Sequence, residues 1–169
     1  MSQSVEEHRE AAPDSIVCAV VTVSDSRDES SDRSGRIMID SLEKAGHRIA
    51  LYRIVRDEPS EIEDILAACR AQQEIQAVLF NGGTGIASRD TTFDVVSRAI
   101  DKELPGFGEL FRMLSWDEIG PAAMLSRATA GVFSGRLLFS TPGSSNAVRL
   151  AMDKLIIPEL GHLVYEVTK

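Results

Sequence analysis

A glycine-rich segment followed by an acid is the part of this sequence best equipped for chemistry. Residues 81–92 read NGGTGIASRDTT and directly follow a short apolar run. Because glycine has no side chain, Gly82, Gly83 and Gly85 allow backbone N–H groups to approach an anionic or heteroaromatic ligand closely. The segment also carries Asp90, a carboxylate that can cap a helix or bind a metal ion.

The segment matches neither of two common nucleotide-binding fingerprints. A Walker A loop ends in Gly-Lys-Ser/Thr, whereas here the glycines are followed by Ile86 and Ala87. The dinucleotide pattern G-x-G-x-x-G is absent because position 88 is serine. A tight strand-to-helix turn without a ligand is the alternative explanation of such a segment.

Two further polar loops are expected at the same edge of a sheet. Ser24 and Asp25 end an apolar, β-branched run, and a second loop follows a predicted hairpin. Because the carboxyl ends of parallel strands lie along one edge, these loops should converge with the glycine segment. Together they supply hydroxyls, bare amides and carboxylates, but no well-placed nucleophile or histidine base. This set suits binding of a phosphorylated small molecule better than acyl transfer. The second loop consists of Pro142, Gly143, Ser144 and Ser145.

A second carboxylate, Asp57, is expected on the same edge, between a strand and a helix. Asp57 and Asp90 are candidates to share a Mg²⁺ ion, since phosphoryl-transfer sites use one or two carboxylates with substrate oxygens. Each acid also has a purely structural explanation: Asp57 as a turn residue, Asp90 as a helix cap and Asp25 as a loop carboxylate without a ligand. Three arginines are candidate phosphate partners or solvated side chains: Arg27, Arg89 and Arg127.

Alternating apolar strands and amphipathic helices must position these loops. The clearest helix signal is a capping-box pattern at Ser60 and Glu63, followed by apolar residues at helical spacing. The order β-α-β-α-β-α over the first hundred residues predicts a parallel sheet with helices on both faces. Strands are predicted at 15–24, 47–55 and 77–80, and helices at 34–45, from 60 onward and at about 92–100.

The second half of the sequence is less regular. A stiff turn at 103–109 leads into a helix ending around Trp116, and 131–133 with 137–139 are typical of a hairpin. Pro158 interrupts or starts the last helix. The helix before the hairpin carries an apolar stripe that packs within its own chain or against another. The stripe is Phe107, Leu110, Phe111 and Leu114.

The length of 169 residues suits a flexible arm at 1–14 and a single domain at 15–169. A net charge of −8 argues against binding to nucleic acid or an anionic membrane. The sequence has no apolar run of membrane-spanning length and no apolar core of a signal peptide near its start. Two cysteines in apolar runs, Cys18 and Cys69, suit reduced, buried thiols in the cytoplasm.

Five motifs occur in a recognisable order: TVSD at 22–25, GGTG at 82–85, RDTT at 89–92, LPGFGE at 104–109 and TPGS at 141–144. With them, the sequence resembles the MoaB/MogA family of molybdenum cofactor biosynthesis proteins over roughly residues 15–160. The stretch 111–120, together with 126–128, is similar to the MoaB branch in particular.

The resemblance implies an α/β fold: a three-layer α/β/α sandwich with a mostly parallel central sheet and a small β-hairpin excursion. It implies a homo-oligomer, a trimer or a hexamer, that binds molybdopterin and works with other proteins of the pathway. It further implies adenylylation of molybdopterin by Mg²⁺ and ATP, giving adenylyl-molybdopterin and pyrophosphate. The alternative is a non-catalytic molybdopterin-binding or carrier protein of the same pathway.

The resemblance also assigns roles to single residues. Asp57 and Asp90 become the catalytic carboxylates and the Mg²⁺ ligands. Because the motif at 89–92 is retained, an active enzyme is favoured over a carrier. The substrate-binding residues become Ser24, Asp25, Gly82, Gly83, Thr84, Gly85, Thr91, Pro142, Gly143, Ser144 and Ser145.

Overall fold

A six-stranded sheet in the order β2-β1-β3-β6-β5-β4 forms the centre of the structure, a computed structural model that describes residues 12–169. Strands β2, β1, β3 and β6 run parallel, β5 pairs antiparallel with β6, and β4 pairs antiparallel with β5. Of the predicted arm at 1–14, residues 1–11 lie outside the described part of the chain. The strands are β1 (Val17–Val23), β2 (Arg48–Val55), β3 (Ala77–Asn81), β4 (Lys102–Glu103), β5 (Thr129–Phe133) and β6 (Arg136–Thr141).

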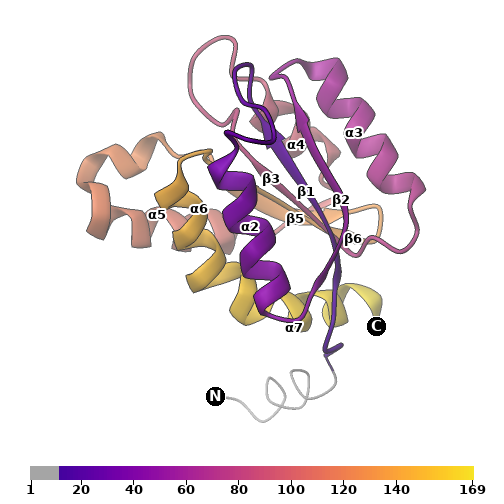
Figure 1. Cartoon of the computed structure of the whole chain (residues 1–169). Coiled ribbons are helices and arrows are strands. Elements are labelled where there is room, and N and C mark those ends of the chain that lie inside the picture. The colour runs from indigo at the N-terminus through magenta and orange to yellow at the C-terminus, as the bar shows by residue number, and fades with distance from the viewer. Residues whose placement is uncertain (1–11) are drawn as a thin grey trace.

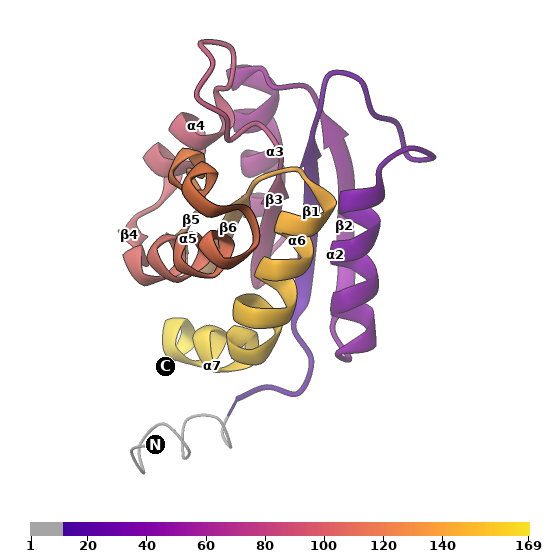
Figure 2. The ribbon, with the colours of Figure 1, turned by 90° about the vertical axis from the view of Figure 1, so that its left-hand side faces the viewer.

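Helices cover both faces of this sheet (Figures 1 and 2). Helices α3 and α4 pack on one face, and α2, α5, α6 and α7 pack on the other. The predicted three-layer α/β/α sandwich with a mostly parallel sheet is therefore confirmed. The helices are α2 (Arg33–Lys44), α3 (Pro59–Ala71), α4 (Thr92–Ala99), α5 (Pro105–Ile119), α6 (Ser145–Ala151) and α7 (Ile157–Thr168), with a 3₁₀ turn η1 (Gly120–Leu125) and a π turn η2 (Met152–Ile156).

Strands β1 and β3 are the most deeply buried elements, because they lie in the middle of the sheet under helices on both sides. Every residue of β3 is buried, and so is every residue of β1 except Val17. Continuous apolar sequence, rather than alternation, is what such doubly covered strands require. The two buried thiols belong to this core: burial raises the pKa of Cys18 to about 12 and that of Cys69 to about 11.

The predicted hairpin, β5 with β6, is continuous with the main sheet. Its two-residue turn, Ser134-Gly135, has positive φ at both positions, as hairpin turns matching the strand twist require. Strand β6 then pairs in parallel with β3, so that Asn81 lies opposite Thr141. This register places the loop after β6 directly beside residues 82–86 after β3, hereafter the glycine loop.

The start of α3 differs in detail from the sequence pattern. The capping box expected at Ser60 and Glu63 does not form, because α3 already begins at Pro59 and Ser60 falls inside its first turn. Proline suits that first position, since its fixed φ is helical and its missing N–H would have no partner there. Pro158 lies in the first turn of α7, which follows α6 without a break through the π turn η2. Over residues 12–169, no helix is both long and apolar enough to cross a membrane.

Candidate functional site

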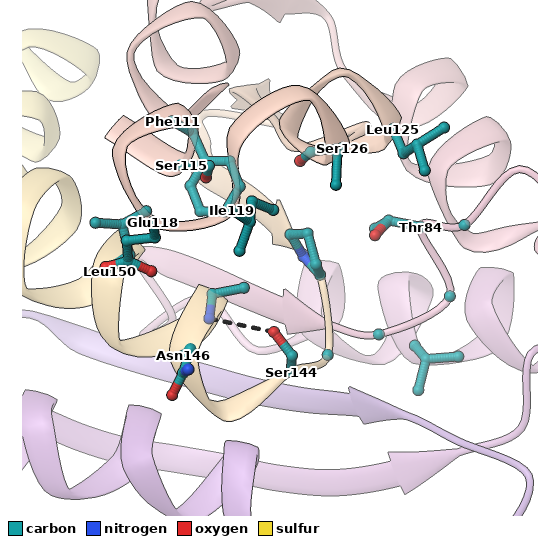
Figure 3. Close-up of a pocket in the computed structure, with 18 of the residues that line it drawn as sticks. Thr84, Phe111, Ser115, Glu118, Ile119, Leu125, Ser126, Ser144, Asn146 and Leu150 are labelled. Atoms are coloured by element: carbon teal, nitrogen blue, oxygen red, sulfur yellow. Dashed lines mark hydrogen bonds between the residues drawn. The ribbon is translucent and has the colours of Figure 1, made fainter. Parts of the chain in front are cut away.

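A cavity of about 420 Å³ opens where β1, β3 and β6 end (Figure 3). The three polar loops predicted from the sequence do converge here: one wall is built by the loops that follow these strands. From the predicted substrate-binding set, the lining includes Ser24, Gly82, Gly83, Thr84, Gly85, Pro142, Gly143 and Ser144. Asp25, Thr91 and Ser145 of that set do not line it, and neither do Asp57 and Asp90.

Glycine is sterically required at the contact between two of these loops. Gly82 and Gly83 have φ values of 99° and 64°, a region that side chains disfavour. A Cβ atom at Gly82 would collide with the backbone carbonyl of Val23, and one at Gly83 with the Thr92 side chain. A Cβ at Gly143 would lie 3.0 Å from the Gly82 Cα, so the two loops touch through bare backbone.

The glycine loop presents backbone donors that the protein itself does not use. Among the described residues, none accepts a hydrogen bond from the N–H groups of Gly83, Thr84, Gly85 or Ile86. Consecutive backbone N–H groups of this kind form concave anion sites in other proteins. The loop can therefore hold a phosphate or another anion without a change of fold.

Arg27 adds a positive charge to the same wall of the cavity. The Ser24 hydroxyl accepts from the Arg27 N–H at 3.2 Å, which shapes the turn after β1. The guanidinium donates to the carbonyl of Gly143 at 3.1 Å and lies 3.7 Å from the carboxylate of Asp32. Arg27 is thus held between two of the converging loops, and the phosphate-partner role proposed for it is sterically available.

The carboxylate of Asp32, which is only 1% exposed, holds the guanidinium of Arg27 in place by an ion pair. Burial alone would raise the pKa of Asp32, but hydrogen bonds from four neighbours outweigh it and hold the pKa below its ordinary value. Asp32 therefore stays ionised and keeps its partner arginine in place. The four neighbours are Thr22, Gly35, Tyr52 and Ser34.

Asp57 lies behind the glycine loop, 8% exposed, and caps α4. Its Oδ1 accepts from the N–H and hydroxyl of Thr91, at 3.0 and 2.9 Å. The same oxygen accepts from the N–H and hydroxyl of Thr92, both at 3.1 Å. The sequence left open that Asp90 caps this helix, but the capping carboxylate comes from a residue far away in sequence. No described residue donates to Asp57 Oδ2.

Asp90 instead closes its own loop. Its Oδ2 accepts from the N–H of Ala87 at 2.9 Å and lies against Gly85, where a Cβ atom would collide with it. Asp25 forms an ion pair with Arg89 and lies 3.4 Å from the N–H of Asp57. Within residues 12–169, no group of three or more histidines, cysteines or acids could hold a metal ion alone. A cation here would need oxygen ligands from a substrate.

The far wall of the cavity was missed by the sequence analysis. It consists of side chains from α5, η1, the residue directly after η1, and α6: Phe111, Ser115, Glu118, Ile119, Leu125, Ser126, Asn146 and Leu150 (Figure 3). The stripe on α5 was interpreted as packing, and Phe111 does pack in the core at 1% exposure. Ser115 and Glu118 follow Phe111 by four and seven residues, so helical spacing was the signal that could have found them.

Comparison with known proteins agrees with this geometry. Residues 19–162 match the family described as "probable molybdopterin binding domain". A Bacillus subtilis protein named molybdenum cofactor biosynthesis protein B is 57% identical over 168 residues, covering 98% of each chain. A crystal structure of a protein of that name has 50% identity and a TM-score of 0.89, covering 92% of this chain and 98% of the other. The tungsten cofactor synthesizing protein MoaB from Pyrococcus furiosus has 36% identity and a TM-score of 0.85, covering 94% and 100%.

Proposed function

The chain belongs to the molybdopterin-binding domain family, among the MoaB proteins of molybdenum cofactor biosynthesis, and on this premise we propose that it adenylylates molybdopterin. The proposed reaction uses Mg²⁺ and ATP and gives adenylyl-molybdopterin and pyrophosphate. The observation that supports it is a cavity with two chemically different ends, one lined by glycine backbone and Arg27 and the other largely by apolar side chains.

The phosphate end is the wall made by the loops after β1, β3 and β6. Unused N–H groups of the glycine loop and the guanidinium of Arg27 supply donors and positive charge there. Preorganised donors of this kind fix a phosphate without the cost of reordering water or side chains. We therefore place the terminal phosphate of molybdopterin at Gly82 to Gly85, facing Gly143.

The heterocycle end is the wall made by α5 and α6. Exposed apolar surface for a flat ring comes from Ile119 and Leu125, and the nearly buried Phe111 and Leu150 complete the lining. Glu118 lies beside Leu150 on one side of the cavity, and Thr84 lies on the opposite side (Figure 3). No described residue pairs with the Glu118 carboxylate, an acceptor that suits the adjacent N–H donors on the pyrimidine edge of a pterin.

The chemistry follows from this orientation. The phosphate of molybdopterin attacks the α-phosphorus of ATP, the new P–O bond forms, and pyrophosphate leaves with the electrons of the broken P–O bond. Both reactants are anions, so repulsion and misalignment make up much of the barrier. The glycine N–H groups and Arg27 lower it by fixing the attacking phosphate, and no protein nucleophile is needed.

Asp57 and Asp90 have the donor chemistry for Mg²⁺. Among the described residues, none donates to Asp57 Oδ2 or Asp90 Oδ1, so each carboxylate keeps an oxygen for a cation. Mg²⁺ in proteins usually binds one or two carboxylates together with water and substrate phosphates. Asp57 and Asp90 would therefore hold it only together with such further ligands, since the described residues form no group of three or more metal-binding side chains. Bound there, Mg²⁺ would offset the negative charge of the ATP phosphates.

The decisive experiment is to mix the purified protein with molybdopterin, MgCl₂ and ATP and to measure pyrophosphate. We expect stoichiometric release, lost in Asp90→Ala while molybdopterin binding is largely retained. A non-catalytic binder or carrier is the second candidate, favoured by the position of both carboxylates outside the cavity lining. Molybdopterin binding by the unaltered protein without any pyrophosphate would establish that second function instead.

The same family membership supports a homo-oligomer, a trimer or a hexamer, working with other proteins of the pathway in the cytoplasm. Helix α5 and η1 carry an exposed apolar surface that a second copy of the chain would cover. Light scattering behind size-exclusion chromatography measures the mass, and a monomer at micromolar concentration would contradict this assembly. The surface consists of Leu110, Met113, Trp116 and Met124, and it borders the cavity-lining Ile119 and Leu125.

A further inference from the structure

Arg127, between η1 and β5, holds the glycine loop from behind. Its Nε donates to the carbonyl of Thr84 at 3.2 Å, and its Nη2 donates to the carbonyls of Gly85 and of Asp90, the latter at 3.0 Å. Thr84 and Gly85 line the cavity, whereas Arg127 does not. The guanidinium is therefore neither a solvated group nor part of the cavity wall.

These contacts determine which way the loop's N–H groups point. In a trans peptide, the C=O of one residue and the N–H of the next point in opposite directions. Arg127 binds two consecutive carbonyls, so the N–H groups of Gly85 and Ile86 are turned away from it. These are two of the loop donors for which the described part of the chain offers no acceptor.

The peptide between Asp90 and Thr91 is held from both sides. Arg127 binds its carbonyl at 3.0 Å, and Asp57 accepts from its N–H at 3.0 Å. Rotation of this peptide would break both hydrogen bonds. Arg127 and Asp57 thus fix together the backbone that carries Asp90.

The guanidinium is itself well supported. It lies 4.7 Å from the centre of the Phe93 ring, and it pairs with Asp94 at 3.4 Å. Its side chain is only 25% exposed. A lysine would keep the charge but lose the planar group that donates in several directions at once and stacks on an aromatic ring.

We propose that Arg127 is a positioning residue for the reaction proposed above: it sets the direction of the phosphate-binding N–H groups and the place of Asp90. This inference rests on the proposed function, but its structural part can be measured without turnover. The test variant is Arg127→Lys in the full-length protein. The matched control is Arg112→Lys, since Arg112 donates at 3.5 Å to the Ser126 carbonyl next door and makes no contact with the loop.

Amide hydrogen exchange without substrate is the first readout. The amides of Ala87, Asp90 and Thr91, which donate hydrogen bonds within and behind the loop, should exchange roughly tenfold faster in Arg127→Lys, because charge-assisted hydrogen bonds to the loop are lost. Arg112→Lys should match the unaltered protein there, and exchange in β1 and β3 should be unchanged in both variants. Unaltered exchange at these three amides in Arg127→Lys would overturn the proposal.

Substrate dependence is the second readout, and it separates positioning from general destabilisation. The molybdopterin KM, or its Kd if no pyrophosphate forms, should rise about tenfold in Arg127→Lys and stay within about twofold in Arg112→Lys. If the unaltered protein releases no pyrophosphate, the proposed function fails, but amide exchange and the molybdopterin Kd can still be measured and still test the role of Arg127. An unchanged molybdopterin Kd in Arg127→Lys would reject the role.

A milder variant covers the case in which Arg127→Lys does not fold. Asp94, whose side chain is 59% exposed, supports the guanidinium from the surface, so Asp94→Asn should fold normally. Losing this partner should speed exchange of the Ala87, Asp90 and Thr91 amides by about twofold to fivefold. Exchange equal to that of the unaltered protein would then count against the proposal.

Discussion

The most informative perturbation separates the two oxygens of Asp57. One oxygen, Oδ1, accepts four hydrogen bonds from Thr91 and Thr92 and so stabilises the start of α4. The other, Oδ2, has no donor among the described residues and is the one proposed to face a cation. Asp57→Ala removes both functions, whereas Asp57→Asn keeps a neutral Oδ1 acceptor and removes the charge.

The expected losses of stability differ enough to be resolved. Alanine leaves the N–H of Thr92, a residue with 0% exposure, without an acceptor, at a cost of about 1–3 kcal/mol. The lost cap adds about 1 kcal/mol, so Asp57→Ala should lose roughly 2–4 kcal/mol. Asparagine loses mainly the charge near the helix N-terminus, about 1 kcal/mol.

Urea unfolding at one fixed protein concentration measures these differences, and pyrophosphate release measures the chemistry of the same samples. Both variants should lose turnover, but only Asp57→Ala should lose more than about 2 kcal/mol of stability. The control is Asp64→Ala on the exposed face of α3, expected within about 0.5 kcal/mol of the unaltered protein. An Asp57→Ala protein as stable as that control would refute the capping argument.

Three further changes test other parts of the account. Gly83→Ala forces a Cβ atom into the Thr92 side chain at a position with positive φ, so the affinity for a phosphate ligand, measured by calorimetry, should fall at least about tenfold. The control is Gly106→Ala, where a Cβ atom meets open space and the affinity should not change. Glu118→Gln should weaken binding of a fluorescent pterin about tenfold in a quenching titration, and the control is Asp117→Asn, which lies outside the lining. If Glu118→Gln bound the pterin as tightly as the unaltered protein, Glu118 would have no place at the heterocycle end. Burial lowers the pKa of His47 below its ordinary 6.5 in the folded protein. Below about pH 6.5 the unfolded chain therefore binds a proton at His47 that the folded chain does not, and the melting temperature should drop as the pH falls. His47→Asn should flatten that slope, and an unchanged slope would assign it to other groups.

Much of this architecture was predictable because its signals are local. The run before Ser24 and the one before Gly82 are continuously apolar, which predicts doubly covered central strands. Parallel strands then require their following loops to meet at one edge, and the cavity lies there. The positive φ at Gly82 and Gly83 explains why glycine occurs at these positions.

What could not be predicted depends on contacts between segments far apart in the chain. The cap of α4 comes from Asp57, 34 residues before Thr91, and the adjacent Asp90 resembled a cap just as well. Arg127 reaches a carbonyl 43 residues away, and no local pattern indicates such a contact. The capping box at Ser60 matched its sequence pattern, but Pro59 already begins the helix.

The central claim is that one cavity binds molybdopterin with its phosphate at the glycine loop and its pterin against α5. A crystal structure of the protein with bound molybdopterin tests it most directly. We predict phosphate oxygens within hydrogen-bond distance of the N–H groups of Gly83 to Ile86, and the ring beside Phe111 and Glu118. A pterin at the glycine loop with the phosphate against α5, or a ligand outside this cavity, would contradict it.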